Sequence, residues 1–170
     1  AGNFSVSYTG DAEHSNAYPK FGSSSIFEDG NTDELIITTN DTSLGGSTAH
    51  TFECWFRTSS NDLQYLVSRN SNQQYAGLSI TPSSDEIIWG GNASGSDLLV
   101  LNVTIELNRW HHIAAVVYGD GNASIFFNGI EVETINNWSA WGFATASDNI
   151  TIGAQHYTNS SHRYTLDGYM

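Results

Sequence analysis

The sequence predicts an all-β protein, an antiparallel sandwich or jelly roll of two sheets, and three observations carry this prediction. Apolar and polar residues alternate with a period of two in many short segments. Glycine occurs 16 times against two prolines, and Gly, Asn, Asp and Ser cluster between these segments as tight turns require. No stretch shows the apolar spacing of an amphipathic helix. Residues 1–170 are assigned to a single domain because no linker or internal repeat interrupts the pattern.

The clearest strand pattern covers residues 99–107. Its odd positions are all apolar, whereas Asn102, Thr104 and Glu106 occupy the later even positions, so one face is expected in the core and the other in water. The other expected strands are residues 4–8, 24–27, 35–38, 50–57, 65–68, 76–80, 86–89, 111–118, 123–127, 130–135 and 150–152.

Asn128-Gly129 lies between two such strands and predicts a two-residue hairpin. Both central residues of a type I′ turn have positive φ, which Asn and Gly tolerate. The glycine-rich residues 118–122 predict a second turn between strands.

The composition excludes several function classes. Five Lys and Arg against 18 Asp and Glu give a formal charge of −13, which repels phosphate backbones and argues against nucleic-acid binding. No apolar run approaches the roughly 20 residues of a membrane-spanning helix, so no membrane insertion is expected. The one cysteine, Cys54, excludes an internal disulfide and lies in an apolar strand, which favours a buried, inert thiol.

Asn-x-Ser/Thr triplets are more frequent than chance, with eight against an expected three or four, roughly. They predict covalent N-glycans on an extracellular protein, although an Asn- and Ser-rich surface would also produce unused triplets. The candidate glycosylation sites are Asn3, Asn40, Asn92, Asn102, Asn122, Asn137, Asn149 and Asn159.

Five segments taken together resemble the laminin-G-like, concanavalin A-like lectin-glucanase jelly-roll family. Their order and spacing agree from about residue 20 to the end, at residues 20–30, 51–57, 109–116, 124–129 and 149–153. The resemblance implies two curved, stacked antiparallel sheets and a role in adhesion or glycan binding, often with one Ca²⁺ ion. Glu28 and Glu34 depart from the family pattern, because they stand where apolar or aromatic residues are usual.

The chain also ends at Met170, where relatives continue into a closing strand, so the sandwich is expected to lack or borrow its last strand. An open edge invites β-augmentation by another copy or by a neighbouring structural protein. Phe4, Val6 and Tyr8 alternate in the N-terminal arm, residues 1–19, which makes the arm a candidate donor to a head-to-tail filament. Alternatively, this segment is the domain's own first strand, or the protein continues beyond Met170.

Residues for catalysis are not apparent. Glycan hydrolysis needs two carboxylates facing each other across a cleft, and Glu131 and Glu133 follow a hairpin in what reads as a solvated edge. His111 and His112 are adjacent on a strand and cannot chelate one metal together, and His112 is expected near the core. We therefore expect a protein that is not an enzyme.

Two binding sites are predicted. Asp29 and Asp33 in an acidic turn, with Asp167 expected nearby, supply the hard oxygens that Ca²⁺ prefers; the alternative is a solvated loop. Four aromatic or imidazole side chains in the late loops would bind glycans by stacking, or instead plug the end of the sandwich. These are Trp138, Trp141, His156 and Tyr157.

Two functions remain open at this point. The first is an extracellular structural or adhesion module, a glycosylated subunit of a filament or of a cell or virion surface. The second is a calcium-dependent, lectin-like carbohydrate binder.

Overall fold

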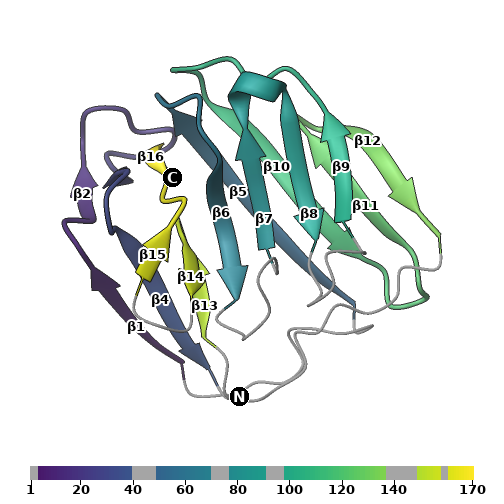
Figure 1. Ribbon diagram of the computed structural model, residues 1–170, viewed down its shortest axis with the longest axis horizontal. Coiled ribbons are helices and arrows are strands. Elements are labelled where there is room, and N and C mark those ends of the chain that lie inside the picture. The colour runs from purple at the N-terminus through teal and green to yellow at the C-terminus, as the bar shows by residue number, and fades with distance from the viewer. Residues whose placement is uncertain (1–3, 40–48, 70–76, 91–97, 137–148, 158–160) are drawn as a thin grey trace.

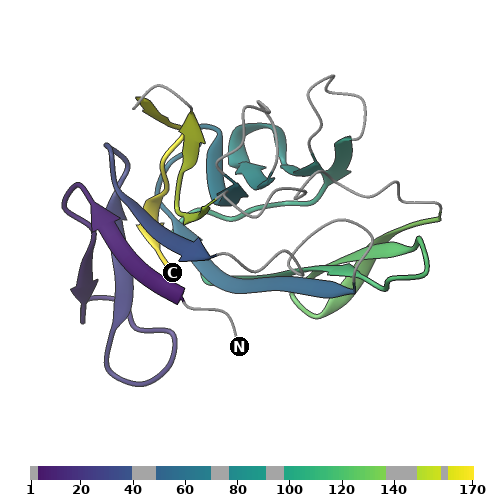
Figure 2. The ribbon, with the colours of Figure 1, turned by 90° about the horizontal axis from the view of Figure 1, so that it is seen from below.

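The computed structural model describes residues 4–39, 49–69, 77–90, 98–136, 149–157 and 161–170. Two seven-stranded antiparallel sheets lie face to face, and Figure 2 shows them as two layers. The first, the β6 sheet, has the order β1 (Phe4–Thr9), β4 (Glu34–Thr39), β13 (Ile150–Ile152), β6 (Gln64–Arg69), β7 (Gly77–Thr81), β8 (Glu86–Gly90) and β9 (Leu98–Asn102).

The second, the β5 sheet, has the order β12 (Ile130–Ile135), β11 (Ala123–Phe127), β10 (His111–Val117), β5 (His50–Thr58), β16 (Asp167–Tyr169), β3 (Ser25–Asp29) and β2 (Glu13–Ser15). β14 (Gln155–Tyr157) and β15 (Ser161–Arg163), both labelled in Figure 1, form a separate two-stranded sheet. The only helical element in the described part of the chain is the 3₁₀ turn η1 (Pro82–Ser84), and none there could cross a bilayer.

The core lies between the sheets and follows the alternation of the sequence. Phe56, Ile113 and Ile125 point inward from the β5 sheet, and Ile80 and Trp89 meet them from the β6 sheet, all fully or almost fully buried. The predicted all-β sandwich is therefore confirmed, since period-two segments can bury one face only by stacking two sheets.

The Asn128-Gly129 turn adopts φ values of 51° and 81°, as a type I′ hairpin requires. The Asn128 side chain also accepts the His112 backbone N–H at 2.9 Å. The prediction that His112 lies near the core is wrong. His111 faces the core, its ring stacked on Phe127, whereas His112 lies on the outer face against Trp55.

The strand expected over residues 99–107 ends at Asn102. Asp85, itself at φ 54°, accepts the Val103 N–H at its carbonyl and the Ile105 N–H at its carboxylate. These bonds hold the chain to the η1 turn, so Ile105 is buried without belonging to a strand.

The chain itself supplies the two strands that the sequence left uncertain, the N-terminal strand and the closing strand. β1 pairs with β4 of its own sheet over six residues, from Phe4 opposite Thr39 to Thr9 opposite Glu34. β16, near the C-terminus, lies between β3 and β5, with Tyr169 opposite both Phe27 and Arg57. Within the described residues the β5 sheet therefore has its closing strand, and β1 is an edge strand of its own domain.

Candidate functional site

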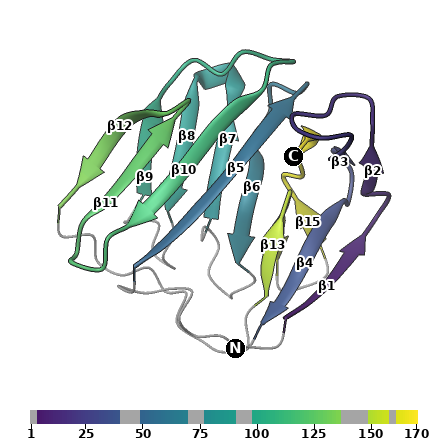
Figure 3. The same ribbon diagram turned by 180° about the vertical axis from the view of Figure 1, so that it is seen from behind.

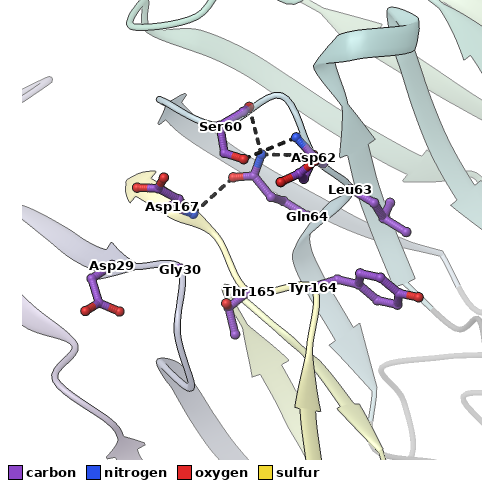
Figure 4. Close-up of a pocket in the computed structure, with 9 residues that line it drawn as sticks. All are labelled: Asp29, Gly30, Ser60, Asp62, Leu63, Gln64, Tyr164, Thr165 and Asp167. Carbon is purple, nitrogen blue, oxygen red and sulfur yellow. Dashed lines mark hydrogen bonds between the residues drawn. The ribbon is translucent and has the colours of Figure 1, made fainter.

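An open hollow of about 550 Å³ lies where β3 and β5 end and β6 and β16 begin (Figure 4). In Figure 4 Asp29 lies on one side of it and Tyr164 on the other, with Thr165 and Asp167 between them. We call it the Asp167 hollow; its lining consists of Asp29, Gly30, Ser60, Asp62, Leu63, Gln64, Tyr164, Thr165 and Asp167. Strand ends from four different segments thus build one polar surface.

The side chain of Gln64 connects these segments through hydrogen bonds. Its side chain is almost fully buried, and its Nε2 donates to the carbonyls of Ser60 and Asp62, both at 3.1 Å. Its Oε1 accepts the Thr58 hydroxyl at 2.8 Å and the Asp167 N–H at 3.0 Å. The amide makes all four of the hydrogen bonds available to it, so the hollow is preorganised.

Three carboxylates, from Asp29, Asp62 and Asp167, line the hollow, and no Lys, Arg or His does among the described lining residues. Asp29 and Asp167 are opposite each other in the β3–β16 pair. The Asp167 carboxylate accepts the Ser59 hydroxyl at 2.9 Å, and that of Asp29 accepts the Asn31 N–H at 3.0 Å. The surface therefore presents hydrogen-bond acceptors, which suit hydroxyl groups or a cation and repel anions.

Asp33, predicted to join Asp29 and Asp167 at a calcium ion, has a different position. It is buried, and its two carboxylate oxygens accept the Asp11 N–H at 2.6 Å and the Asp29 N–H at 2.8 Å. Gly10 makes this possible, because a Cβ there would lie 2.1 Å from Asp33 Oδ1. Asp33 thus fixes the turn behind the hollow and does not line it.

The remaining pair supplies only part of a calcium site. Among the described residues no three His, Cys, Asp or Glu side chains lie close enough to hold a metal ion together. Ca²⁺ takes six to eight oxygen ligands, so Asp29 and Asp167 would need main-chain carbonyls, water or a ligand's hydroxyls to complete the shell.

Tyr164 gives the hollow an aromatic side. The residue is 46% exposed, and its ring stacks on that of Tyr65, with centroids 6.3 Å apart and an interplanar angle of 27°. Its φ of 58° is unusual for a tyrosine, and the neighbouring peptide is fixed by a hydrogen bond from the Tyr65 N–H to the Tyr164 carbonyl at 2.9 Å. Sequence reasoning missed Tyr164 and Gln64, since neither lies in a recognisable motif.

A buried carboxyl group lies on the interior side of β3. Glu28 is fully buried, and neither of its carboxyl oxygens has a hydrogen-bond partner among the described residues. Burial, together with the charges of Asp33 and Glu34, raises the pKa of Glu28 to about 8, so the group is mostly protonated at neutral pH. The sequence marked Glu28 as a departure from its family, and the structure shows that it enters the sandwich interior.

Several predicted residues cannot be placed at a site. Trp138 and Trp141 lie outside the described residues, and only the backbone is described for His156 and Tyr157, in β14. Of the sequons, Asn102 is exposed on β9, and Asn122 and Asn149 are half-buried. Asn3, Asn40, Asn92, Asn137 and Asn159 lie outside the described residues.

Two further residues are located as the sequence suggested. Cys54 is partly buried and packs against the core. Burial and, to a smaller extent, the charge of Glu53 raise the pKa of its thiol to about 12, which favours the less reactive protonated form. Glu131 is exposed on β12, where its carboxylate accepts the hydroxyls of Ser124 and Thr134 at 2.6 and 2.7 Å.

Comparison with known proteins gives a family and a set of folds. The family model described as the concanavalin A-like lectin/glucanases superfamily, of laminin-G type, matches residues 29–170. No curated protein matches the chain. The binding domain of Paraclostridial Mosquitocidal Protein 1 superposes with a TM-score of 0.65 at 15% identity, over 98% of this chain and 43% of that one.

Two other solved structures share the fold. The carbohydrate-binding module CBM40 of the Ruminococcus gnavus IT-sialidase, bound to sialyllactose, gives a TM-score of 0.59 at 17% identity, over 74% of this chain and 71% of that one. A heptameric SAP-like pentraxin from Limulus polyphemus gives 0.54 at 17%, over 74% and 61%. The chain thus spans less than two thirds of the pentraxin and of the mosquitocidal binding domain.

Proposed function

Because the chain belongs to the concanavalin A-like lectin/glucanases superfamily, we propose that it is a carbohydrate-binding module that holds a saccharide in the Asp167 hollow. The observation that carries the proposal is the hollow itself: fixed acceptor groups, held by the fully bonded Gln64, beside the exposed ring of Tyr164. Sugar hydroxyls donate to such carboxylates, and an aromatic ring packs against the apolar face of a pyranose.

The saccharide unit in the hollow is uncharged. Three carboxylates line the hollow, and the chain carries a net charge of −13, so an acidic sugar there would be repelled. Binding of sialyllactose by the CBM40 structure supports glycan recognition on this fold but not the same charge preference at this position.

The proposed role is non-catalytic and extracellular. The solved structures compared above include a toxin binding domain and a carbohydrate-binding module. The one sequon on a described strand with an exposed asparagine is Asn102, at the sheet edge formed by β9, where a glycan would also block edge-to-edge pairing. Intact-mass measurement of the protein from its native source tests glycosylation.

Calcium dependence is an alternative form of the same function. Asp29 and Asp167 are adjacent across β3 and β16, so an ion held there could also accept ligand hydroxyls. A calcium titration followed by thermal melting tests this form of the function.

Assembly into a surface layer or filament is the second candidate function. It is supported by β1, an edge strand on which Val6 is 57% exposed and Tyr8 66% exposed. Another copy pairing along β1 would cover both side chains. Light scattering of the Val6→Lys and Tyr8→Lys variants tests this, since only an assembly through β1 would dissociate.

A glycan array followed by calorimetric titration tests the carbohydrate proposal. We expect neutral oligosaccharides to bind, and Asp62→Asn together with Asp167→Asn to weaken binding about tenfold or more. Glu133→Gln, an exposed carboxylate outside the hollow, is the matched control and leaves affinity unchanged. Equal binding by both variants would reject the Asp167 hollow as the site.

A further inference from the structure

A second polar and aromatic surface covers the outer side of the β5 sheet, the nearer layer in Figure 3. The connection from β2 to β3 folds across this side and places its side chains on β5 and β16. We call the surface the Trp55–Arg57 face; it consists of Tyr18, Lys20, Phe21, Trp55, Arg57 and Tyr169.

Two cations lie directly over aromatic rings on this face. Lys20 Nζ is 3.9 Å from the ring centroid of Trp55, and Arg57 Cζ is 4.0 Å from that of Tyr18. Tyr18 also meets Tyr169 edge-on at 5.1 Å, and Phe21 meets Trp55 edge-on at 5.7 Å. The rings therefore fix both charged groups in position before any ligand arrives.

No described carboxylate neutralises either cation. In a chain with 18 acidic residues and only five Lys and Arg, neither Lys20 nor Arg57 forms an ion pair with a described residue. Arg109, by contrast, pairs with Glu106. Both Lys20 and Arg57 remain partly exposed, so their N–H groups are available to an anionic group from outside.

The surroundings limit that anion to a small one. Trp55 and Arg57 are two residues apart on β5, so their side chains emerge about 7 Å from each other. Glu53 lies one such step beyond Trp55, beside His112 at 3.9 Å, and Asp167 lies one step beyond Tyr169. These carboxylates and the net charge of −13 repel an extended polyanion or an anionic membrane. A single carboxylate, in contrast, can bind between Lys20 and Arg57.

The exposed rings favour a cyclic ligand over an acidic peptide. Phe21 is 67% exposed and Tyr18 48% exposed, and they flank the two cations. We propose that the Trp55–Arg57 face is a binding subsite for a monosaccharide unit that carries one carboxylate, with Arg57 and Lys20 binding the carboxylate and Tyr18 or Phe21 packing on the sugar ring.

This inference rests on the proposed carbohydrate-binding function and adds an acidic unit to it. Asp167 and Tyr169 belong to the same strand and point to the same side, as do Asp29 and Phe27. A short oligosaccharide can therefore place a neutral unit in the Asp167 hollow and an acidic unit on the Trp55–Arg57 face.

The test compares sugars that differ only in the acid group. The probes are sialyllactose against lactose, and methyl glucuronide against methyl glucoside, titrated into ¹⁵N-labelled protein while the Trp55 indole N–H is observed. A Trp55→Phe spectrum assigns that signal. We expect one acidic probe to bind about fivefold more tightly than its neutral partner and to shift the Trp55 signal. The probe pair that responds tells a sialic acid from a uronate.

Two variants separate the site from general electrostatics. The combined change Lys20→Met and Arg57→Met removes the acid preference while keeping the apolar stems, whereas Arg109→Met, elsewhere on the chain, keeps it. If the neutral partners bind as tightly as the acidic probes, the inference fails and carbohydrate binding stands. If no saccharide binds at all, both fail. If a short glutamate peptide displaces the acidic probe at equal concentration, the ligand class is wrong.

Discussion

Glu28 on β3 lies against Gly153, which follows β13 in the opposite sheet, so closely that a Cβ on Gly153 would be 1.8 Å from the Glu28 carboxyl oxygen Oε2. Because Gly153 has no side chain, it leaves room for the buried carboxyl group. Gly153 in turn accepts the Leu166 N–H at 2.6 Å, one residue before Asp167. The contact therefore connects the interior of the sandwich to the base of the Asp167 hollow.

The ionisation of Glu28 makes stability depend on pH. Its pKa is raised to about 8 in the folded protein from 4.5, so the unfolded chain loses this proton first. From this group alone the free energy of unfolding is highest below pH 4.5, falls by about 1.4 kcal/mol per pH unit above it and levels off above pH 8. At pH 4 we expect Glu28→Gln and the wild type to have about the same Tm. Between pH 5 and pH 8 the Tm of the variant should exceed that of the wild type by an increasing amount. Glu53→Gln, on the exposed side of β5, is the control, and a pH-independent Tm difference for Glu28→Gln contradicts the assignment.

Gly153→Ala should destabilise the protein through the same contact. The added methyl group meets the enclosed Glu28 carboxyl, and φ at Gly153 is +82°. Gly129→Ala is a matched control, since φ there is +81° with open space around it. We expect Gly153→Ala to cost about 1–3 kcal/mol more in denaturant unfolding than Gly129→Ala. Adding Glu28→Ala should recover part of that difference, and equal costs for both alanine variants would refute the contact.

Gln64→Leu should remove the hydrogen bonds that join the segments lining the Asp167 hollow. The change leaves the Thr58 hydroxyl and the Asp167 N–H without their partner at Gln64 Oε1, and frees the carbonyls of Ser60 and Asp62. We expect a loss of about 2–4 kcal/mol in the free energy of unfolding and reduced saccharide binding. Leu63→Ala, a neighbouring lining residue outside this network, serves for comparison. Binding that survives Gln64→Leu unchanged would show that the network does not organise the site.

Calcium binding, if it occurs, should depend on Asp167 and not on Asp33. Millimolar calcium is expected to raise the Tm of the wild type, and Asp167→Asn to abolish that rise. Asp33→Asn should lower the Tm, because the amide keeps only one oxygen to accept the N–H groups of Asp11 and Asp29, but it should retain the calcium response. A wild-type Tm that does not respond to calcium eliminates the calcium-dependent form of the function.

The sequence predicted the sandwich because alternation and turn chemistry are local. Asn128-Gly129 specifies its own turn, and the odd positions from Leu99 specify a buried face. It did not predict the short strands β2, β14, β15 and β16, because these segments contain no aliphatic residue whose alternation could be recognised, unlike the equally short Ile150–Ile152. β16 is stabilised by pairing on both sides, which only the folded chain provides.

The candidate site was less accessible to sequence reasoning for a related reason. Asp29 and Asp167 were identified as acidic residues brought together by the fold, and they are opposite each other. Asp33 is also an aspartate, but both of its carboxylate oxygens accept backbone N–H groups. The composition of the turn does not reveal these hydrogen bonds. Gln64 and Lys20 acquire their roles from residues distant in the chain, namely Asp167 and Trp55.

Chemical-shift mapping of ¹⁵N-labelled protein with a neutral oligosaccharide identified on the array tests the central claim most directly. The account predicts saturable shifts concentrated at residues 60–64 and 164–167, including the Gln64 side-chain amide, and their loss in the combined Asp62→Asn and Asp167→Asn variant. Saturable shifts confined to other parts of the sandwich, or no shifts with any saccharide, would contradict it.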